Sequence, residues 1–334
     1  MARKRSQRSQ RSQRSQQSQR SQRSQRSQRS RKSAKSTKKV KRRNSSYISP
    51  RACSPLRKST IKNGEFSTCY TLEALQKIRQ AYNKTAPSKD KIPNRKTKKG
   101  LWNAIKDKID NMTDCEGEWC WVEQPFMNNI DDPELKNLTF KPPIPKGKYD
   151  WLSTDDIDRV MKQYSKMHPE FYFMGTWPMD FEKLHSKFSK FDPDMLQKKG
   201  FTSAGLVLNE DKSDEPGSHW VGMFIMLPSR QVQFFDSYGK KPLKPVCEWV
   251  TNINHRIKKK KGKPFTVLWN PHRHQYANSE CGVYTINFLV KRLEGKTFKS
   301  IVNNQIKDEQ MNKRRNTFFN PFNKYDNTIF GGNN

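Results

Sequence analysis

Apolar residues recur at helical spacing in two segments of the first half of the chain, TLEALQKIRQAYN and GLWNAIKDKIDNM. The two stripes consist of Leu72, Leu75, Ile78 and Tyr82 and of Leu101, Ile105, Ile109 and Met112. Spacings of three and four residues place such side chains on one face of a helix. Thr71 precedes the first stripe in the position of an N-cap. We therefore expect two helices and assign residues 61–145 to a small helical accessory region.

From Trp151 onward the pattern is that of a larger folded domain. The segment WLSTDDIDRVMKQYSKM predicts a helix with Ser153 as its N-cap and Asp156 three residues later, close to a capping box. Its buried stripe comprises Ile157, Val160, Met161 and Tyr164. Further along, CGVYTINFLVKRLEG predicts a second helix. Its inward-facing residues are Val283, Ile286, Leu289, Val290 and Leu293.

Between these two helices lie three segments rich in β-branched and aromatic residues, SHWVGMFIML, QVQFFDS and PFTVLWN, which indicate strands. The turn PSR separates the first two, so we expect them to pair as a hairpin. Helix, strands and helix in this order indicate an α+β domain. We place it at residues 150–315, after the linker-like segment FKPPIPKGKYD and before a C-terminal tail, residues 316–334.

Positive charge is concentrated at the N-terminus. The chain has 66 Lys and Arg against 32 Asp and Glu, a formal net charge of +34. Residues 1–60 hold 21 of the basic residues and none of the acidic ones. The RSQ repeat in this segment has no apolar residue to bury, so we expect a disordered basic tail. A flexible polycation binds polyanions, which makes nucleic acid the expected partner of the tail.

The cysteines indicate a compartment rather than a metal site. There are six, namely Cys53, Cys69, Cys115, Cys120, Cys247 and Cys281. The N-terminus lacks the apolar segment of a secretory signal, and no apolar run is long enough to span a membrane. We therefore expect reduced thiols in a soluble intracellular protein with no membrane partner. Cys115 and Cys120 lack a second Cys or His pair nearby, so we expect core thiols there and no metal.

The expected hairpin brings two polar residues together. If Leu227 pairs with Arg230 across the turn, Asp236 lies opposite Val221. His219 is two residues from Val221 on the same face, so His219 and Asp236 are diagonal neighbours, roughly 7–8 Å apart at the backbone. A carboxylate beside an imidazole fixes its tautomer and stabilises its charged form. The pair is therefore a candidate base with its orienting group.

Cys281 lies where the last predicted helix begins. The helix dipole favours a thiolate at this position, and a nearby charged histidine favours it further. Gly282 lets the backbone pass close to a bound molecule, and the side-chain amide of Gln275 can donate to an oxyanion. We expect Ser237 to be a supporting hydrogen-bond donor. Each of these residues alone is most often structural, and it is their combination that indicates catalysis.

The order of these residues resembles a known family. The motifs SHW, DS 17 residues later, and Q-x5-C-G resemble the ubiquitin-like-protein (SUMO) proteases and the adenovirus protease (adenain) group. The segment WLSTDDID is similar to the helix that opens their catalytic domains. The chain is also similar in character to the African swine fever virus-type protease of large DNA viruses. The resemblance covers about residues 150–295.

This resemblance implies a papain-like α+β catalytic domain with a mixed sheet and with the nucleophile at a helix N-terminus. It implies four catalytic residues, namely the general base and acid His219, its orienting group Asp236, the oxyanion-hole residue Gln275 and the nucleophile Cys281. Trp220 would wall a narrow substrate channel, in which Gly282 also lies. No cofactor is implied, although DNA or a peptide can act as an activator in this group.

Two features depart from the family pattern or compete with it. Glu280 precedes the nucleophile where the SUMO proteases usually have Asp, and some viral relatives use another third residue in place of the one expected at Asp236. His272 and His274 flank Gln275 and are alternative bases, but neither has an evident carboxylate to orient it. We therefore retain His219 as the expected base.

The expected function is that of a cysteine endopeptidase that cleaves after Gly-Gly in protein precursors with Gly-Gly-X sites. The resemblance implies maturation of viral structural proteins during virion assembly, in the virion and the host cytoplasm. One alternative is a deconjugating protease for a ubiquitin-like modifier. Acyl transfer by a related triad is a second alternative, and a nucleic-acid packaging protein with a vestigial domain is a third.

Overall fold

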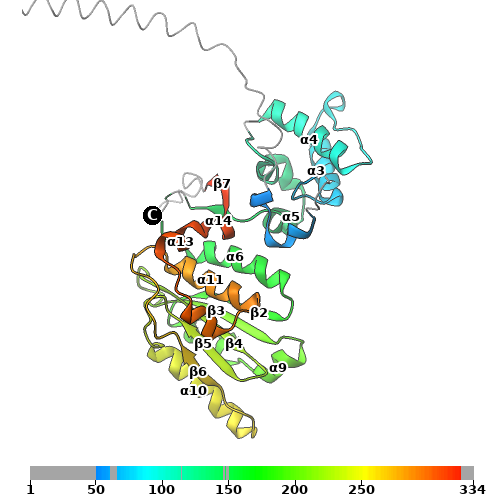
Figure 1. Ribbon diagram of the computed structural model, residues 1–334. Coiled ribbons are helices and arrows are strands. Elements are labelled where there is room, and N and C mark those ends of the chain that lie inside the picture. Colours follow the sequence, from blue (N-terminus) through cyan, green and yellow to red (C-terminus); the bar gives the residue numbers. More distant parts are fainter. Residues whose placement is uncertain (1–49, 61–65, 114, 146, 148–149, 325–334) are drawn as a thin grey trace, which may run out of the picture. The chain divides into compact units, whose positions relative to one another are not determined.

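The computed structural model describes residues 50–60, 66–113, 115–145, 147 and 150–324, all of which fall within one compact unit, Ser45–Asn334 (Figure 1). The tail expected to be disordered lies outside the described residues as far as residue 49. Its last part does not fit that expectation, because residues 50–60 form two 3-10 turns, η1 (Pro50–Ala52) and η2 (Pro55–Thr60). Ala52 and Cys53 are buried there, which anchors the segment in a folded core.

Residues assigned to the accessory region form helices and turns. In chain order these are α3 (Leu72–Thr85), η3 (Ser88–Asp90), α4 (Lys98–Met112), η4 (Glu118–Glu123), η5 (Pro125–Asn129) and α5 (Pro133–Leu138). Thr71 caps α3 as predicted, since its side chain accepts a hydrogen bond from the backbone N–H of Ala74. The two predicted stripes face one core, except that Met112 is 65% exposed. Met112 is the last residue of α4, where the chain leaves that core.

Two disulfides cross-link this region, Cys53–Cys69 and Cys115–Cys120. The expectation of reduced thiols is therefore wrong at these four positions. Folding brings the paired Cα atoms to 5.2 and 5.7 Å, within disulfide range, and sequence spacing alone does not reveal this. Among the described residues, the cysteines that remain free are Cys247, which is exposed, and Cys281, which is buried.

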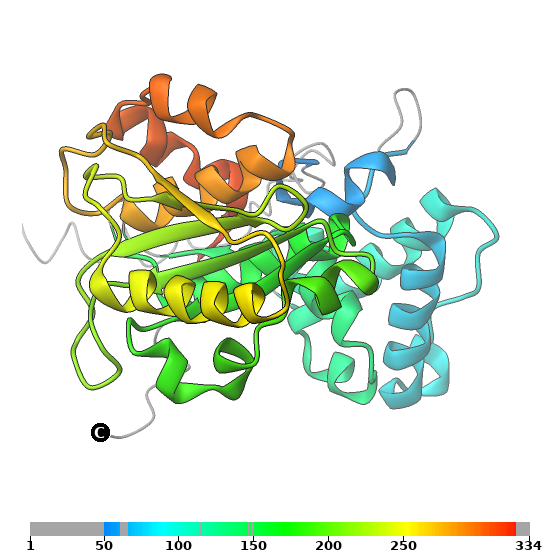
Figure 2. The same cartoon turned by 90° about the horizontal axis from the view of Figure 1, so that it is seen from below.

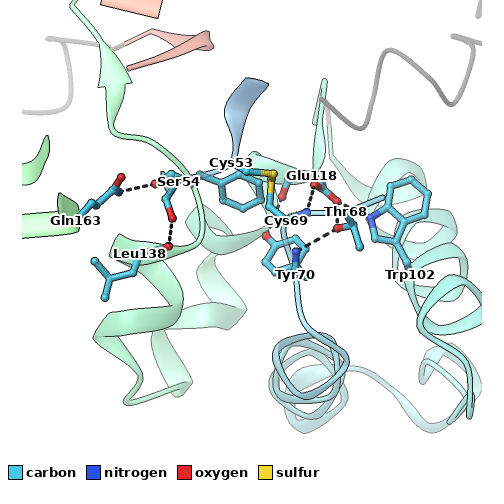
Figure 3. Close-up of a disulfide and its surroundings, with 10 residues drawn as sticks. Cys53, Ser54, Thr68, Cys69, Tyr70, Trp102, Glu118, Leu138 and Gln163 are labelled. Carbon is cyan, nitrogen blue, oxygen red and sulfur yellow. Dashed lines mark hydrogen bonds between the residues drawn. A yellow bond between two sulfur atoms is a disulfide. The ribbon is translucent and has the colours of Figure 1, made fainter. Parts of the chain in front are cut away.

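A buried carboxylate lies beside the first disulfide (Figure 3). Glu118 accepts hydrogen bonds from the backbone N–H of Cys69 at 3.0 Å and from the indole N–H of Trp102 at 2.6 Å. The Thr68 hydroxyl donates to the same carboxylate. Burial disfavours the charged form and raises the pKa of Glu118. The network ties η4 to α4 and to the segment that precedes α3.

The described residues of the expected linker and of the expected C-terminal tail are part of the fold, and the tail after residue 324 lies outside the described residues. β1 (Pro143–Ile144) pairs in parallel with β7 (Asn320–Lys324). Beside this pairing, the Lys141 ammonium donates to the backbone oxygen of Asn316 at 2.9 Å. The segment between the accessory region and the α+β domain is therefore held by C-terminal residues that lie beyond the predicted domain boundary at residue 315.

A five-stranded mixed sheet forms the centre of the α+β domain. Its strands, in spatial order, are β2 (Phe171–Trp177), β3 (Ser203–Asn209), β4 (Trp220–Met226), β5 (Gln231–Phe235) and β6 (Thr266–Trp269). The outer pairs β2/β3 and β5/β6 are parallel, and the two inner pairs are antiparallel. The predicted hairpin is β4–β5, and its register is the predicted one. Gly222 lies opposite Phe235 and Met223 opposite Phe234.

Helices cover both faces of the sheet (Figures 1 and 2). On one face lie α6 (Thr154–Met167), α11 (Cys281–Leu293), α12 (Phe298–Asn303), α13 (Asp308–Lys313) and α14 (Arg315–Phe318). The other face packs against α10 (Lys244–Lys259) and the short helices α7 (Phe181–Leu184), α8 (Ser186–Ser189) and α9 (Pro193–Lys198). Ser153 and Asp156 form the predicted capping box of α6. In the part of the chain that the structure describes, no helix is long and apolar enough to cross a bilayer.

Candidate active site

His219 and Asp236 meet at the open end of the β4–β5 hairpin. His219 directly precedes β4, and Asp236 directly follows β5. The His219 Nε2 and Asp236 Oδ1 atoms are 2.7 Å apart, with the side chains 4% and 0% exposed. The predicted diagonal neighbours are thus in direct contact, because the hairpin register places both on the same face.

The turn after β5 fixes the Asp236 carboxylate. Its Oδ1 also accepts the backbone N–H of Tyr238 at 2.8 Å, and its Oδ2 accepts that of Lys240 at 3.0 Å. Gly239, with φ of +78°, closes the turn by donating its N–H to the Asp236 carbonyl at 2.9 Å. The Asn270 side chain donates to the same carbonyl at 2.9 Å. A carboxylate held this firmly also fixes the imidazole that it bonds.

The charged form of His219 is stabilised in this setting. Burial opposes the charge, but the hydrogen bond to Asp236 and the interaction with Cys281 outweigh it and raise the pKa of His219 to about 9. The Tyr238 ring stacks on the imidazole, with centroids 4.4 Å apart and planes 16° apart. Among the described residues, His219 Nδ1 has no hydrogen-bond partner. The nitrogen that Asp236 does not hold is therefore the one available for proton exchange with the Cys281 sulfur.

Cys281 is the first residue of α11 and is 2% exposed. The unpaired N–H groups and the dipole of a helix N-terminus favour negative charge at this position. The Cys281 side chain is one of the groups that raise the pKa of His219, which is consistent with the predicted nucleophile lying beside the predicted base. Together with Asp236 they have the composition of a thiolate–imidazolium site.

Gln275 lies in the same loop as the nucleophile and is completely buried. Ser237 donates its hydroxyl to the Gln275 side-chain oxygen at 2.6 Å, which is the supporting role expected of Ser237. The Gln275 amide nitrogen donates to the Ala277 carbonyl at 2.8 Å. These contacts fix which end of the amide carries the N–H groups and leave one N–H for another acceptor.

Trp220 and Gly282 pack against the segment that opens the domain. The Trp220 indole donates to the Leu152 carbonyl at 2.8 Å, and only 7% of the side chain is exposed. A Cβ on Gly282 would lie 3.1 Å from the Leu152 side chain. The small size of Gly282 therefore allows close packing against Leu152, and its expected place in a substrate channel stays a prediction. Trp151, the residue before Leu152, is 50% exposed.

The competing histidines do not form a second site. His274 is buried, its Nε2 bonds the Val302 carbonyl at 3.1 Å, and burial lowers its pKa. It is therefore a structural group without an orienting carboxylate. His272 and His255 are exposed, and the His185 ring caps α8 by accepting the Lys187 N–H at 3.1 Å.

Sequence reasoning missed Glu210, which brings a second carboxylate to the pair. One ligand atom each from Glu210, His219 and Asp236 lies within 4.8 Å of the others, a spacing that suits a metal ion. The His219 Nε2 is already bonded to Asp236, however, and the Lys240 ammonium lies 3.4 Å from Glu210. The arrangement therefore favours an oriented histidine over a metal ligand set. Glu210 is remote in sequence, and no motif marks it.

The C-terminal helices support the nucleophile loop, which sequence reasoning also missed. Asp308 accepts the backbone N–H groups of Tyr276 at 2.9 Å and Ala277 at 2.7 Å. Asn312 donates to the Glu280 side chain at 2.9 Å. Nothing in the sequence marks Asp308 or Asn312, because the segment from residue 306 to 319 is mostly polar.

The chain is similar in sequence to known viral proteases. Residues 151–326 match the model of the Ulp1 protease family, C-terminal catalytic domain. A protein of Acanthamoeba polyphaga mimivirus named as a thiol protease is 30% identical over 284 residues, covering 80% of this chain and 92% of that protein. A cysteine protease of African swine fever virus is 26% identical over 272 residues, covering 74% of this chain and 99% of the relative.

The fold is also similar to a solved structure. The crystal structure of the African swine fever virus protease superposes with a TM-score of 0.55 at 21% identity. The match covers 83% of this chain and 98% of that chain, so it extends well beyond the catalytic domain. The resemblance inferred from the short motifs is therefore confirmed, and so is the α+β fold with a mixed sheet.

Proposed function

This chain belongs to the Ulp1 protease family and is a cysteine protease, and we propose that it is an endopeptidase that cleaves protein precursors after Gly-Gly. The observation that carries the proposal is the contact of 2.7 Å between His219 and Asp236, next to Cys281 at the start of α11. An oriented imidazole beside a thiol at a helix N-terminus is the arrangement that activates a cysteine nucleophile.

In the proposed mechanism, the Cys281 thiolate attacks the scissile carbonyl while Asp236 holds the protonated imidazole. The oxyanion forms next to α11, where the remaining N–H of Gln275 and a backbone N–H of the first turn stabilise it. His219 then transfers its proton to the leaving amine, which departs and leaves an acyl-enzyme. Water activated by His219 hydrolyses this thioester and restores the thiolate.

Selection for glycine follows from how Trp220 is fixed. Its indole is adjacent in sequence to the base, is buried, and is tied to the Leu152 carbonyl. A substrate backbone that passes a rigid indole toward Cys281 has little room for a Cβ at the two positions before the scissile bond. Glycine permits such a close approach and the extended backbone that it requires.

We further propose that this cleavage matures viral structural precursors during virion assembly, a role compatible with the relatives being proteases of two viruses. In this proposal the enzyme acts in the virion and the host cytoplasm, and its partners are precursors with exposed Gly-Gly-X segments. The basic N-terminal segment would add nucleic acid as a second partner, since residues 1–60 hold 21 Lys and Arg without an acidic residue.

A second candidate function is the removal of a ubiquitin-like modifier from other proteins. The observation that favours it is that some of the African swine fever virus relatives carry the name SUMO-1 cysteine protease. Both functions use the same catalytic residues and the same Gly-Gly requirement. They differ in the substrate surface, because a modifier is a folded domain and a precursor site is a flexible peptide.

The experiment that tests the proposal compares the two substrate types with the full chain. An unfolded peptide with a central Gly-Gly-X segment and a SUMO conjugate with the same cleavage sequence are incubated in parallel. We expect turnover of the peptide at a rate at least comparable to that of the conjugate, and none with Cys281→Ala. Turnover of the conjugate alone would establish deconjugation, and equal cleavage of Ala-Ala-X and Gly-Gly-X peptides would refute the channel argument.

A further inference from the structure

Arg315 lies in the protein interior next to the nucleophile loop. It is the first residue of α14, and its side chain is 2% exposed. Its Nη2 donates to the carbonyl of Ser279, two residues before Cys281, at 3.1 Å. The same nitrogen donates to the carbonyl of Asp150, at the start of the catalytic domain, at 2.7 Å. One guanidinium thus ties the nucleophile loop to the segment that opens the domain.

A buried guanidinium is costly unless a negative charge compensates it. Among the described residues, the Nε and Nη1 atoms of Arg315 have no hydrogen-bond partner. Burial lowers the pKa of Arg315, and the negative charges of Glu280, Asp150, Cys281 and Asp156 oppose that shift. An arginine keeps its proton at any working pH. Because Arg315 bonds the carbonyl of Ser279, two residues before Cys281, its permanent positive charge lies near the nucleophile.

We propose that Arg315 is a positioning residue for the nucleophile, which holds the Ser279 carbonyl in place and stabilises the Cys281 thiolate by its charge. The inference rests on the proposed role of Cys281. His219 also carries a positive charge at this site, but it loses that charge when it protonates the leaving amine. Arg315 keeps its charge throughout the cycle, so it also favours the return of the thiolate when the acyl-enzyme is hydrolysed.

The other ionisable groups around the nucleophile come from every element that packs on it. They are His219 before β4, Asp236 and Tyr238 after β5, Arg273 and Glu280 in the nucleophile loop, Asp150 and Asp156 at the start of the domain, and Asp308 of α13. The carboxylates in this set all oppose a thiolate. The cations among them are His219, Arg273 and Arg315, and of these Arg315 is the one that bonds the Ser279 carbonyl.

Two substitutions separate the charge of Arg315 from its hydrogen bonds. Arg315→Gln keeps an amide donor for the carbonyls and removes the charge, whereas Arg315→Lys keeps the charge with fewer donors. Alkylation by iodoacetamide is followed in the full-length protein from pH 5 to 10, with mass spectrometry to quantify Cys281 and Cys247 separately. The exposed Cys247 is the internal reference, and circular dichroism checks the fold of each variant.

We expect Arg315→Gln to alkylate Cys281 about tenfold more slowly at pH 7, with the midpoint of the pH profile about one unit higher, because one unit corresponds to a tenfold change. Arg315→Lys should keep a midpoint close to that of the native protein, and Cys247 should not respond to either change. A native profile in folded Arg315→Gln would overturn the inference. So would a shift of the same size in Arg315→Lys, or the unfolding of both variants, which would make Arg315 purely structural.

The native protein tests the premise separately. Cys281 should react faster than Cys247 near neutral pH, because a thiolate reacts and a thiol does not. If Cys281 were the slower of the two in the native protein, the proposed function itself would fail. If Cys281 were faster but insensitive to Arg315→Gln, the proposed function would stand and the role of Arg315 would not.

Discussion

At the scale of single residues, the site depends on one short contact that controls the charge of one histidine. His219 is buried, and burial by itself would favour the neutral ring. Asp236 reverses this preference, and with Cys281 it raises the pKa of His219 to about 9, above the ordinary value near 6.5. The imidazolium therefore persists through neutral pH, and its contribution is lost as the pH rises through about 9.

The substitution Asp236→Asn tests this balance. The amide cannot supply the negative charge, so the pKa of His219 should fall and the alkaline limb of kcat/KM should move from near pH 9 to lower pH. We also expect kcat/KM at neutral pH to fall by about 10²- to 10⁴-fold, as for the loss of an orienting carboxylate in a triad. A pH–rate profile with the Gly-Gly-X peptide measures both effects. An unchanged alkaline limb would show that another group titrates there.

The catalytic residues should also act as one unit. Cys281→Ala and His219→Ala should each lower kcat by more than about 10³-fold, and the double variant should be hardly worse than either one. Each change removes a small part of a packed site, so the thermal unfolding midpoint should move little. Single-turnover assays on the three variants check this, and simple multiplication of the two single effects would contradict it. Ser237→Ala is the milder control, because it removes only the support of Gln275.

At the scale of elements, the sequence predicted what depends on neighbouring residues. The helix stripes, the capping box of α6 and the register of β4–β5 all follow from residues within about 20 positions of each other. The hairpin pattern alone was therefore enough to place His219 and Asp236 side by side. Local patterns could not predict the contacts of Arg315, because its partners Ser279 and Asp150 are 36 and 165 residues away. The same holds for Glu210, which reaches the site only through the folded sheet.

The disulfides are the clearest failure of sequence reasoning at this scale. The expectation of reduced thiols rested on the absence of a secretory signal, which is an argument about compartment and not about geometry. The structure pairs Cys53 with Cys69 and Cys115 with Cys120 inside a region with few long elements. Small helical regions with limited cores gain much from such cross-links.

Removing these disulfides should weaken the accessory region in proportion to loop length. The Cys53–Cys69 bridge spans 16 positions and Cys115–Cys120 spans 5. The chain-entropy relation then predicts a loss in the free energy of unfolding of about 3 kcal/mol for Cys53→Ser with Cys69→Ser, and about 2 kcal/mol for the other pair. Chemical denaturation of both double variants measures this. A larger loss from the short loop would show that native contacts, and not loop entropy, dominate.

At the scale of the whole molecule, the first 49 residues differ from the rest of the chain in charge, because they are basic and contain no acidic residue. Residues 1–49 hold 18 Lys and Arg and no acidic residue, while the remaining residues carry 48 basic and 32 acidic side chains. The catalytic residues all lie beyond residue 200, so chemistry and charge are carried by different parts of the sequence. A polycationic segment contributes to nucleic-acid affinity through counterion release, without reading the base sequence.

Deletion of residues 1–49 should therefore separate two activities. We expect the shortened protein to cleave the Gly-Gly-X peptide at close to the native rate and to lose most of its salt-dependent affinity for DNA. The slope of log affinity against log salt should become shallower by about 0.9 for each phosphate that the deleted segment had neutralised.

A variant with the same 49 residues in scrambled order is the matched control, and it should bind DNA like the native protein because only charge matters. An unchanged slope after deletion would place the binding surface on the folded part of the chain. Loss of cleavage that added DNA or added tail peptide restores would instead make the tail or the nucleic acid an activator of the enzyme.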